Sequence, residues 1–383
     1  MEKISHYLID TGSNWIEHAM KSITAAVLRE SHGKFALETV ILDDLHEGEL
    51  LVRLDACGIC HTDEKFREVV PLPAVLGHEG TGIVEETGPG VKTIRPGDRV
   101  IMSYPWCGNC PYCMRDEPYK CENIPILKFG GARLDKSRTI FIHGKPVTGA
   151  FFQQSSFATH AITLERSVIS APLDMPAEML AAIPCSIQTG AGAVVNSFDM
   201  KKGESLMVFG AGAVGLSAVM AAKILGASPI ICIDRIQSRL DLAAELGADH
   251  VLNIDAGEIP SRVREIMPRG INYAFETSTT VKALEDALEC IGQGGRIGIV
   301  SYPDDGKKFP FTTKNLFQRV GSIQGIIQGH SVPGIFIPKL IEWQRQGIFP
   351  YHKLITTYAF SDINKAFQDA ALGAVVKPVL MMN

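Results

Sequence analysis

The sequence has little net charge, no secretory-signal pattern in its opening residues and no internal repetition, and each of these absences narrows the classes of function that we expect. Its formal net charge is only −5 over 383 residues, so it offers no broadly basic surface to nucleic acid or to an anionic membrane. The opening residues, MEKISHYLIDTGSNWIEHAM, contain neither the apolar segment nor the small-residue cleavage site of a secretory signal. No repeat or low-complexity tract interrupts the sequence. We therefore expect a cytoplasmic protein that binds neither nucleic acid nor membrane.

Disulfide bonds are not expected either. The nine cysteines are an odd number, and a reducing cytoplasm disfavours disulfides. Four of the nine fall within PWCGNCPYCMRDEPYKC, which begins at Pro105 and ends at Cys121. Cysteines clustered in this way in a reducing compartment indicate metal or redox chemistry.

One uncharged stretch, SLMVFGAGAVGLSAVMAA at residues 205–222, is long enough to imitate a membrane span. Its glycines recur at fixed spacing, and Lys223 follows at once. We interpret it as a short strand, a glycine turn and a helix of a globular domain, and not as a span.

The remaining composition predicts an α/β protein with two cores. A chain of 383 residues with 46% hydrophobic and 21% charged residues is globular and too long for one ordinary core. Short apolar runs separated by Gly-Pro turns fill the first half, which is typical of a β-rich domain. From residue 205 strands alternate with helices, expected at 213–225, 238–246 and 281–290, and this alternation predicts a doubly wound parallel sheet.

The expected boundaries follow these changes of pattern. Residues 1–20 form an appended, weakly structured segment, residues 21–187 the β-rich domain with the cysteine loop, and residues 188–328 the parallel-sheet domain. Residues 329–383, with a helix at 338–346 and the ending KPVLMMN, are expected to return to the first domain.

The cysteine loop predicts a structural zinc site. Its ligands would be Cys107, Cys110, Cys113 and Cys121, because four thiolates at such spacings suit tetrahedral zinc. An iron–sulfur cluster is the alternative, but the ferredoxin run places its fourth cysteine three residues after the third, and here the gap is seven. A closed set of four thiolates leaves no position for a substrate, so catalysis is expected elsewhere.

A second, open metal site is a weaker expectation. Cys60 in CGICHTDEKF, His78 in GHEGTG and Cys185 in IPCSIQTGAG could supply three ligands and leave a vacancy. On spacing alone the cysteines could equally be small buried apolar residues, and the histidine could be structural.

The stretch VFGAGAVGLSA contains Gly210, Gly212 and Gly215 in the pattern G-x-G-x-x-G. It follows an apolar strand, opens a helix and precedes Asp234, which ends the next strand. This context predicts a dinucleotide site, with the pyrophosphate at the helix N-terminus and the ribose at the acid. Glycines that merely pack a helix on a sheet are the alternative.

Together these motifs resemble those of the zinc-dependent medium-chain alcohol dehydrogenases, over about residues 21–383. CHTD resembles the family's Cys-x-[Ser/Thr]-Asp motif and GHEGTG its GHE motif, while Cys185 matches the third ligand. The resemblance implies a GroES-like catalytic domain, a Rossmann domain, NAD, one catalytic and one structural zinc, and a homo-oligomer, a dimer or tetramer. FFQQSSFATHA and CSIQTGAGAVV are most similar to bacterial aryl-alcohol (benzyl-alcohol) dehydrogenases.

The resemblance also implies roles at the substrate and the catalytic zinc. Thr62 would hydrogen-bond the substrate hydroxyl, Asp63 would orient His78, and Glu79 would belong to the catalytic set. Many members carry a histidine three residues after the Ser/Thr, at the end of a proton relay. Lys65 occupies that position here, so its part in a relay is an open question.

At the cofactor the resemblance places His61 and Lys377 near the pyrophosphate, Arg239 near the adenosine ribose, and Thr189 in the binding set. Asp234 favours NAD over NADP, because its charge would repel a 2′-phosphate. Arg235 and Arg239 argue the other way, since arginine can bind that phosphate.

The expected reaction is oxidation of a primary aromatic alcohol to the aldehyde, with Tyr104 and Trp106 lining the substrate cleft. Aliphatic-alcohol and glutathione-dependent formaldehyde dehydrogenases are the enzymatic alternatives. Arg115 and Arg133 could anchor the carboxylates of a glutathione adduct. A non-enzymatic, zinc-stapled nucleotide sensor is the remaining alternative.

Overall fold

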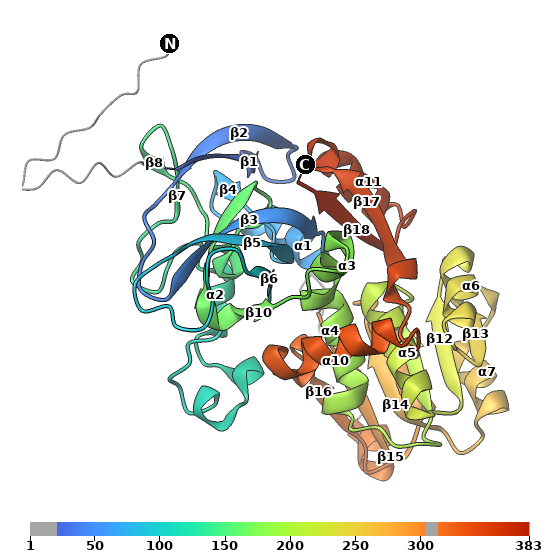
Figure 1. The fold of residues 1–383 in the computed structure, drawn as a ribbon. Helices are drawn as coiled ribbons and strands as arrows, with labels where there is room; N and C mark the ends of the chain where they lie inside the picture. The colour runs from blue at the N-terminus through green and yellow to red at the C-terminus, as the bar shows by residue number, and fades with distance from the viewer. Residues whose placement is uncertain (1–20, 303–312, 383) are drawn as a thin grey trace, which may run out of the picture.

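The computed structural model describes residues 21–302 and 313–382. The expected N-terminal segment, residues 1–20, lies outside the described residues. The described chain forms a β-rich part and a parallel-sheet part that lie side by side, with the C-terminus on the β-rich part (Figure 1).

Two sheets of the described residues build the β-rich part. One has the order β4 (Ala74–Val75), β1 (Ser22–Leu28), β2 (Phe35–Leu42), β7 (Ile140–Ile142) and β8 (Lys145–Pro146). The other has the order β10 (Val168–Ser170), β6 (Arg99–Met102), β5 (Gly80–Thr87), β3 (Glu49–Gly58), β18 (Lys377–Met381) and β17 (Ile355–Ala359), with β9 (His160–Leu164) also paired to β3.

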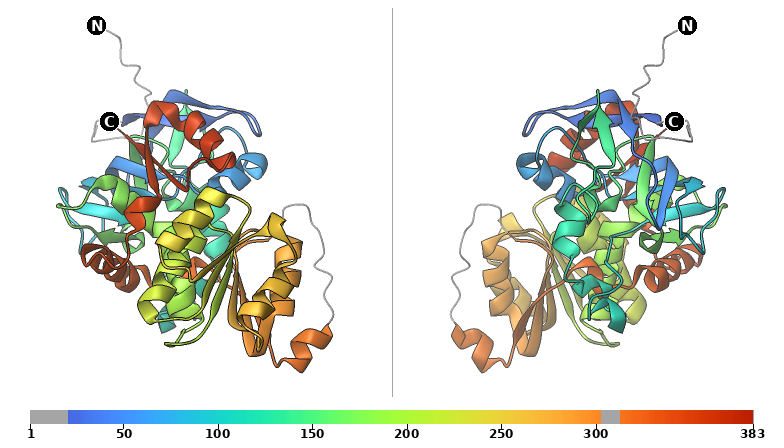
Figure 2. Two further views of the ribbon diagram at one scale, coloured as in Figure 1. Left: turned by 90° about the vertical axis from the view of Figure 1, so that its right-hand side faces the viewer. Right: turned by 90° about the vertical axis from the view of Figure 1, so that its left-hand side faces the viewer.

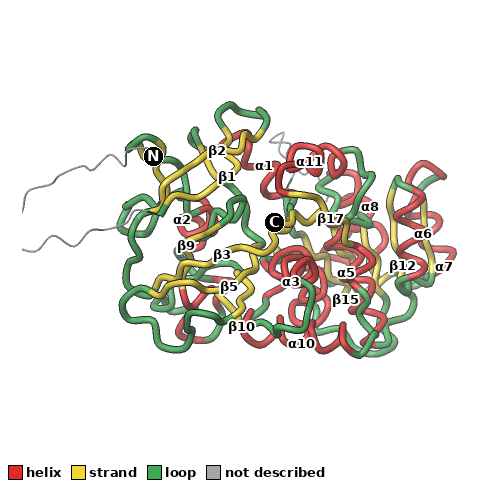
Figure 3. Tube along the Cα trace, turned by 45° about the horizontal axis from the view of Figure 1, so that its top comes forward, coloured by secondary structure: helices red, strands yellow, loops and turns green. Residues whose placement is uncertain are grey.

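The C-terminal tail returns to this part of the molecule, as the sequence predicts. Val379–Met381 of β18 pairs antiparallel with residues 56–58 of β3, and β17 adds a parallel strand outside it. The last described strand is therefore an interior strand of this sheet, between β3 and β17, and the C-terminal end of the chain is drawn between those two strands in Figure 3.

The second part contains the predicted parallel sheet. Its order is β13 (His250–Asn253), β12 (Ile230–Asp234), β11 (Leu206–Phe209), β14 (Ile271–Glu276), β15 (Ile291–Ile299) and β16 (Ser322–Gly325). Chain order reverses between β11 and β14, and a ligand crevice is expected at the carboxyl ends of strands where this happens.

The central strands β11, β12 and β14 are largely apolar on both faces because helices cover both faces of the sheet (Figure 2). In β11, Leu206 and Val208 pack in the same cluster as α5, whereas Met207 and Phe209 pack in the cluster of α7 and α8. Alternate residues of a strand point to opposite faces, so the sequence of a strand that is buried on both faces is one apolar run.

The described helices are α1 (His61–Val69), α2 (Ile124–Phe129), α3 (Ala177–Ala182), α4 (Gln188–Gly192), α5 (Ala213–Leu225), α6 (Gln237–Glu245), α7 (Ile259–Ile266), α8 (Val281–Cys290), α9 (Thr313–Gln318), α10 (Pro333–Arg345) and α11 (Ile363–Ala371).

One long helix joins the two parts. It runs from Ala177 to Ser197 and includes α3, α4 and two π-helical turns. By length and composition it could cross a membrane, but 83% of its apolar window is buried inside the protein, which is typical of a core helix. The expected boundary at residue 187 falls within this helix, so the exact domain limits stay a prediction.

The prediction for the helix at 338–346 was wrong at its start. The helix α10 begins at Pro333 and contains Pro338. Proline is favoured in the first turn of a helix, because backbone N–H groups there have no acceptor within the helix and the missing N–H costs no hydrogen bond. Pro338 lies deeper and removes a bond to the carbonyl of Gly334, but that residue is exposed, so water can satisfy the carbonyl.

A buried ion cluster fixes the loop after α2. The guanidinium of Arg133 donates to Glu49 at 2.7 and 3.0 Å, to Asp43 at 2.6 Å and to the carbonyl of Asp44 at 2.9 Å. Arg133 and Glu49 are both buried. Arg133 is therefore committed to the fold and cannot anchor a substrate carboxylate, which corrects the role suggested for it above.

Arg133→Met should lower the free energy of unfolding by about 3 kcal/mol or more, because it leaves Glu49 buried without its cation. Arg29→Met is the matched control, since it breaks the exposed pair of Arg29 with Glu38, and its denaturation midpoint should hardly move. Equal midpoint losses for both variants in chemical denaturation would contradict the structural role of the cluster.

Candidate functional site

A cleft of about 1070 Å³ lies where the two parts meet. It is lined by α1 and α2 of the β-rich part, by the long helix, by the carboxyl ends of β11 and β12, and by the segment that leads into β18. Most of the sequence-predicted site residues border this cleft.

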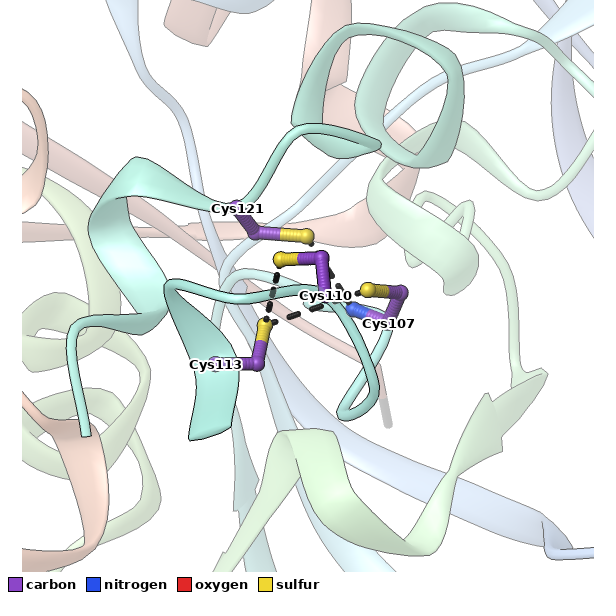
Figure 4. Close-up of side chains that lie close together, drawn as sticks. All are labelled: Cys107, Cys110, Cys113 and Cys121. Carbon is purple, nitrogen blue, oxygen red and sulfur yellow. Dashed lines mark hydrogen bonds between the residues drawn. The ribbon is translucent and has the colours of Figure 1, made fainter. Parts of the chain in front are cut away.

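The four-cysteine cluster does not line the cleft. Its sulfur atoms converge within one loop (Figure 4), and all lie within 4.8 Å of one another. Cys113 Sγ is 3.5 Å from Cys110 Sγ and 3.9 Å from Cys107 Sγ. A zinc tetrahedron with Zn–S bonds of about 2.3 Å has edges of about 3.8 Å, so these thiols fit the predicted structural zinc.

The second ligand set lies at the floor of the cleft. The ligand atoms of Cys60, His78, Glu79 and Cys185 also lie within 4.8 Å of one another, and the two sulfurs are 3.9 Å apart. Nε2 of His78 is buried and has no hydrogen-bond partner among the described residues. A buried polar atom without a partner is costly, so a metal ion at this point would satisfy it. The donor set therefore fits zinc, and Cys60 and Cys185 face the open cleft.

Local structure explains how each ligand is placed. Cys60 is the N-cap of α1, and Cys185 lies on the π-helical turn Ile183–Ile187. His78 follows Gly77, which has a φ of +92° and would bring a Cβ to 2.4 Å from the Phe157 nitrogen. Only glycine suits that position, so the glycine before the histidine is required by the backbone.

Asp63 holds two of the ligand segments together. It is fully buried, and its carboxylate accepts the Cys60 N–H at 3.0 Å and the Gly77 N–H at 3.2 Å. It also lies 2.9 Å from Nδ1 of His78. A carboxylate at Nδ1 fixes the ring with Nε2 directed at the metal position.

Glu79, the carboxylate of this set, forms a buried ion pair with Lys377. The other carboxylate oxygen of Glu79 accepts from Ser186 Oγ at 3.3 Å, and Lys377 Nζ donates to the Ile59 carbonyl at 3.2 Å. Gly58 makes room for the pair, because a Cβ there would lie 2.0 Å from the Glu79 carboxylate. Lys377 borders the cleft, so its role near a pyrophosphate stays a prediction.

Contact between the two thiols of the open set shifts their pKa values in opposite directions. The hydrogen bond from Cys185 holds the pKa of Cys60 well below its ordinary value, against the opposing effect of burial. The same contact, with burial, raises the pKa of Cys185. Cys60 is thus the more acidic of the two thiols.

The glycine loop has the geometry of a phosphate-binding turn. Gly210 has a φ of +97°, and a Cβ on Gly215 would lie 1.8 Å from the Gly210 carbonyl oxygen. Gly212 has nothing within 4 Å of its Cβ position and borders the cleft. A ligand can therefore approach this backbone at the N-terminus of α5, where N–H groups and the helix dipole favour a pyrophosphate.

Asp234 lies at the end of β12, on the same side of the cleft. Its carboxylate accepts the Ala211 N–H at 2.6 Å and the Ile236 N–H at 2.8 Å. Arg239 borders the cleft from α6 and donates to the Val375 carbonyl at 3.1 Å, while its Nε is buried without a partner among the described residues. This arrangement fits a dinucleotide, with the ribose at Asp234.

The other predicted residues reach the cleft from two elements. Thr62, His61 and Lys65 line it from α1, and Thr189 lines it from α4. Nζ of Lys65 donates to the Tyr302 carbonyl at 2.9 Å and lies 3.9 Å from the Tyr302 ring centroid. Lys65 therefore bridges the two parts of the molecule at the cleft, and a relay role for it stays a prediction.

The prediction that Tyr104 and Trp106 line the cleft was wrong. Tyr104 is buried with its hydroxyl on the Ser331 carbonyl at 2.6 Å, and neither ring borders the cleft. Arg115 does not border it either; its nearest acid is Glu117 at 3.6 Å. The Ser331 carbonyl comes from a distant segment of the chain, which local pattern could not reveal.

Phenylalanines form the wall that sequence reasoning missed. Phe66, Phe129 and Phe152 line the cleft. Phe66 stacks on Phe129 at a centroid distance of 4.1 Å, and Phe152 stacks on the His78 ring at 4.2 Å. Lys128 lines the same wall, and burial lowers its pKa to about 8.

Comparison with known proteins agrees with this geometry. The family models "Alcohol dehydrogenase GroES-like domain" and "Zinc-binding dehydrogenase" match residues 46–172 and 213–343. Geraniol dehydrogenase of Castellaniella defragrans is 39% identical over 364 residues, which are 94% of this chain and 98% of that protein.

Two solved structures are also similar over 95% of this chain and 100% of their own. An alcohol dehydrogenase zinc-binding domain protein from Burkholderia ambifaria has a TM-score of 0.92 and 42% identity. Benzyl alcohol dehydrogenase from Acinetobacter calcoaceticus has a TM-score of 0.91 and 38% identity. With a closed thiolate cluster, an open Cys/His/Cys set and a dinucleotide loop on this fold, the chain belongs to the zinc-dependent medium-chain alcohol dehydrogenases, enzymes that use NAD and zinc.

Proposed function

We propose that this enzyme oxidises a primary aromatic alcohol of about benzyl size to the aldehyde, reversibly and with NAD. The observation that carries the proposal is the phenylalanine wall. Phe66, Phe129 and Phe152 border the cleft, and Phe152 packs directly on the ligand His78. An aromatic substrate gains from apolar burial and from ring–ring contact on such a wall.

Different residues of the cleft would bind the metal, orient its histidine ligand and transfer the proton. When bound, zinc supplies a Lewis acid that lowers the pKa of an alcohol hydroxyl, and NAD supplies the hydride acceptor. Cys60, His78 and Cys185 would hold the metal, and Asp63 keeps the histidine oriented. Thr62, two residues after Cys60 and on the cleft, would accept the hydroxyl proton and pass it toward solvent.

The nucleotide side of the cleft positions the cofactor. The N-terminus of α5 would hold the pyrophosphate, with His61 and Lys377 near it, and Asp234 and Arg239 would face the adenosine ribose. Thr189, buried on the long helix that joins the two parts, would contact the cofactor near the reacting centre. Lys65 could end a proton relay from its place on Tyr302. A cytoplasmic homo-oligomer completes the proposal.

An aliphatic or allylic alcohol is the second candidate, and the similarity to a geraniol dehydrogenase favours it. The glutathione adduct has less support, because Arg133 is buried in an ion cluster and Arg115 lies off the cleft.

Benzyl alcohol should exceed ethanol in kcat/KM by more than about a hundredfold, from burial and ring contact. Phe129→Ala should reduce that ratio by about tenfold, whereas Phe317→Ala, an exposed ring outside the cleft, should leave it unchanged. Steady-state rates of NADH formation with benzyl alcohol, geraniol, ethanol and S-hydroxymethylglutathione measure this. If ethanol, geraniol or the glutathione adduct equals benzyl alcohol, the aromatic assignment is wrong.

The two metal sites should respond differently to loss of a ligand. Cys113→Ser should remove one zinc and lower the melting temperature, because structural zinc contributes folding free energy. Cys185→Ser should abolish turnover and keep most of the thermal stability. Metal analysis, melting curves and rates test both variants, with Cys232→Ala, a buried cysteine outside both clusters, as the control that keeps two zinc ions. One zinc per wild-type chain would contradict the assignment.

Asp234 should make NAD the better cofactor. Its carboxylate would repel a 2′-phosphate at the end of β12. Asp234→Asn keeps the size and one acceptor oxygen but removes the charge, so kcat/KM for NADP relative to NAD should rise about tenfold or more. Rates with both cofactors at saturating alcohol give the ratio, and Asp241→Asn, on α6 and off the cleft, is the control. Equal wild-type efficiency with the two cofactors would rule out the selectivity.

A further inference from the structure

The proposed reaction leaves Lys128 without a role, although it lies in the middle of the aromatic wall. It is on α2 between Leu127, which packs in the core, and Phe129, which lines the cleft. Lys128 itself lines the cleft and is only 5% exposed. Lysine is rarely buried to this extent unless it is paired.

Among the described residues, no carboxylate pairs with the amine of Lys128 and no acceptor takes its hydrogen bonds. Its surroundings are rings: Nζ lies 5.0 Å from the centroid of Phe152 and 5.3 Å from that of Tyr104. Ring faces attract a cation, but they do not satisfy the three N–H donors of an ammonium group. Those donors are left for water or for a ligand in the cleft.

The amine is also close to the reacting end of the cleft. Phe152 stacks on the His78 ring at a centroid distance of 4.2 Å, so the imidazole and the Lys128 amine both pack against one phenylalanine. Cys60, Cys185 and Lys128 line the same cleft, so the far end of a small aromatic alcohol whose hydroxyl lies at the two cysteines can reach this amine.

We propose that Lys128 is a specificity-determining residue that donates hydrogen bonds to an oxygen substituent on the ring of the alcohol substrate. The preferred class is a benzylic alcohol that carries a carboxylate away from its reacting carbon. A carboxylate in an apolar wall is costly to desolvate unless a cation and N–H donors meet it, and Lys128 supplies both. This inference rests on the proposed aromatic-alcohol function.

The test compares pairs of alcohols that differ only in the substituent. 3- and 4-(Hydroxymethyl)benzoate are measured against 3- and 4-methylbenzyl alcohol, so that ring and reacting group are constant. In Lys128→Met, which keeps the length of the side chain and removes its charge, kcat/KM for the better benzoate should fall about 10- to 100-fold, mainly through KM. In the same variant, kcat/KM for the methyl counterpart should equal or exceed the wild-type value.

Two further variants sharpen the result. Lys128→Arg keeps a cationic donor and should retain most of the preference for the benzoate. Lys339→Met removes an exposed lysine that lies over the ring of Trp343 on α10, outside the cleft. This variant should leave kcat/KM unchanged for both members of each substrate pair.

The outcomes separate the two proposals. The ratio of kcat/KM for benzyl alcohol to that for ethanol decides whether the substrate is aromatic. The ratio of kcat/KM for the benzoate to that for its methyl counterpart, measured in wild type and in Lys128→Met, decides the role of Lys128. An unchanged ratio in Lys128→Met would overturn the inference, and so would an equal loss for both members of a pair, because Lys128 would then serve the fold or the reaction itself.

Discussion

The buried carboxylate of Asp63 is the constraint on which the open metal-ligand set depends. It accepts the backbone N–H groups of Cys60 and Gly77 and contacts Nδ1 of His78. A buried charge without such partners would be expensive, so the same bonds that stabilise the acid also fix the segments that carry two ligands. Helix α1, the loop between β4 and β5, and the imidazole ring are positioned by one side chain. Cys185 then completes the set from the helix that joins the two parts.

The cleft has a different character on each side of this centre. Toward the parallel sheet it is built of backbone: the glycine loop, the N-terminus of α5 and the N–H groups held by Asp234. Toward the β-rich part it is built of side chains, with phenylalanines from α1, from α2 and from the segment before β9. Backbone recognition suits a cofactor with a fixed pyrophosphate, whereas a wall of side chains can set the choice of alcohol. We expect Lys128, a buried amine in that wall, to contribute to the selection of the alcohol substrate.

Local pattern predicted a large share of the fold. The helices at 213–225 and 281–290 occur with the predicted bounds, because each has clear ends: glycines around one, and Thr280 capping the other. The helix expected at 338–346 starts five residues earlier than predicted, since a proline can begin a helix or interrupt it and the sequence does not say which. Pro333 begins this helix and Pro338 lies inside it.

By itself the sequence determined the two sites whose residues lie in short, regular spacing, the four thiols and the glycine loop. Their geometry is largely local, because backbone turns of fixed length bring the groups together. The open set was a weaker expectation from spacing, since Cys60, His78 and Cys185 meet only in the tertiary structure. Only the tertiary structure decided that Tyr104 turns its hydroxyl to Ser331 and leaves the cleft to phenylalanines. It also decided that Arg133 is a core residue and that Lys128 lines the phenylalanine wall of the cleft. These placements depend on contacts between segments that are far apart in the chain. The local sequence pattern does not predict which face of a short helix will contact a distant strand.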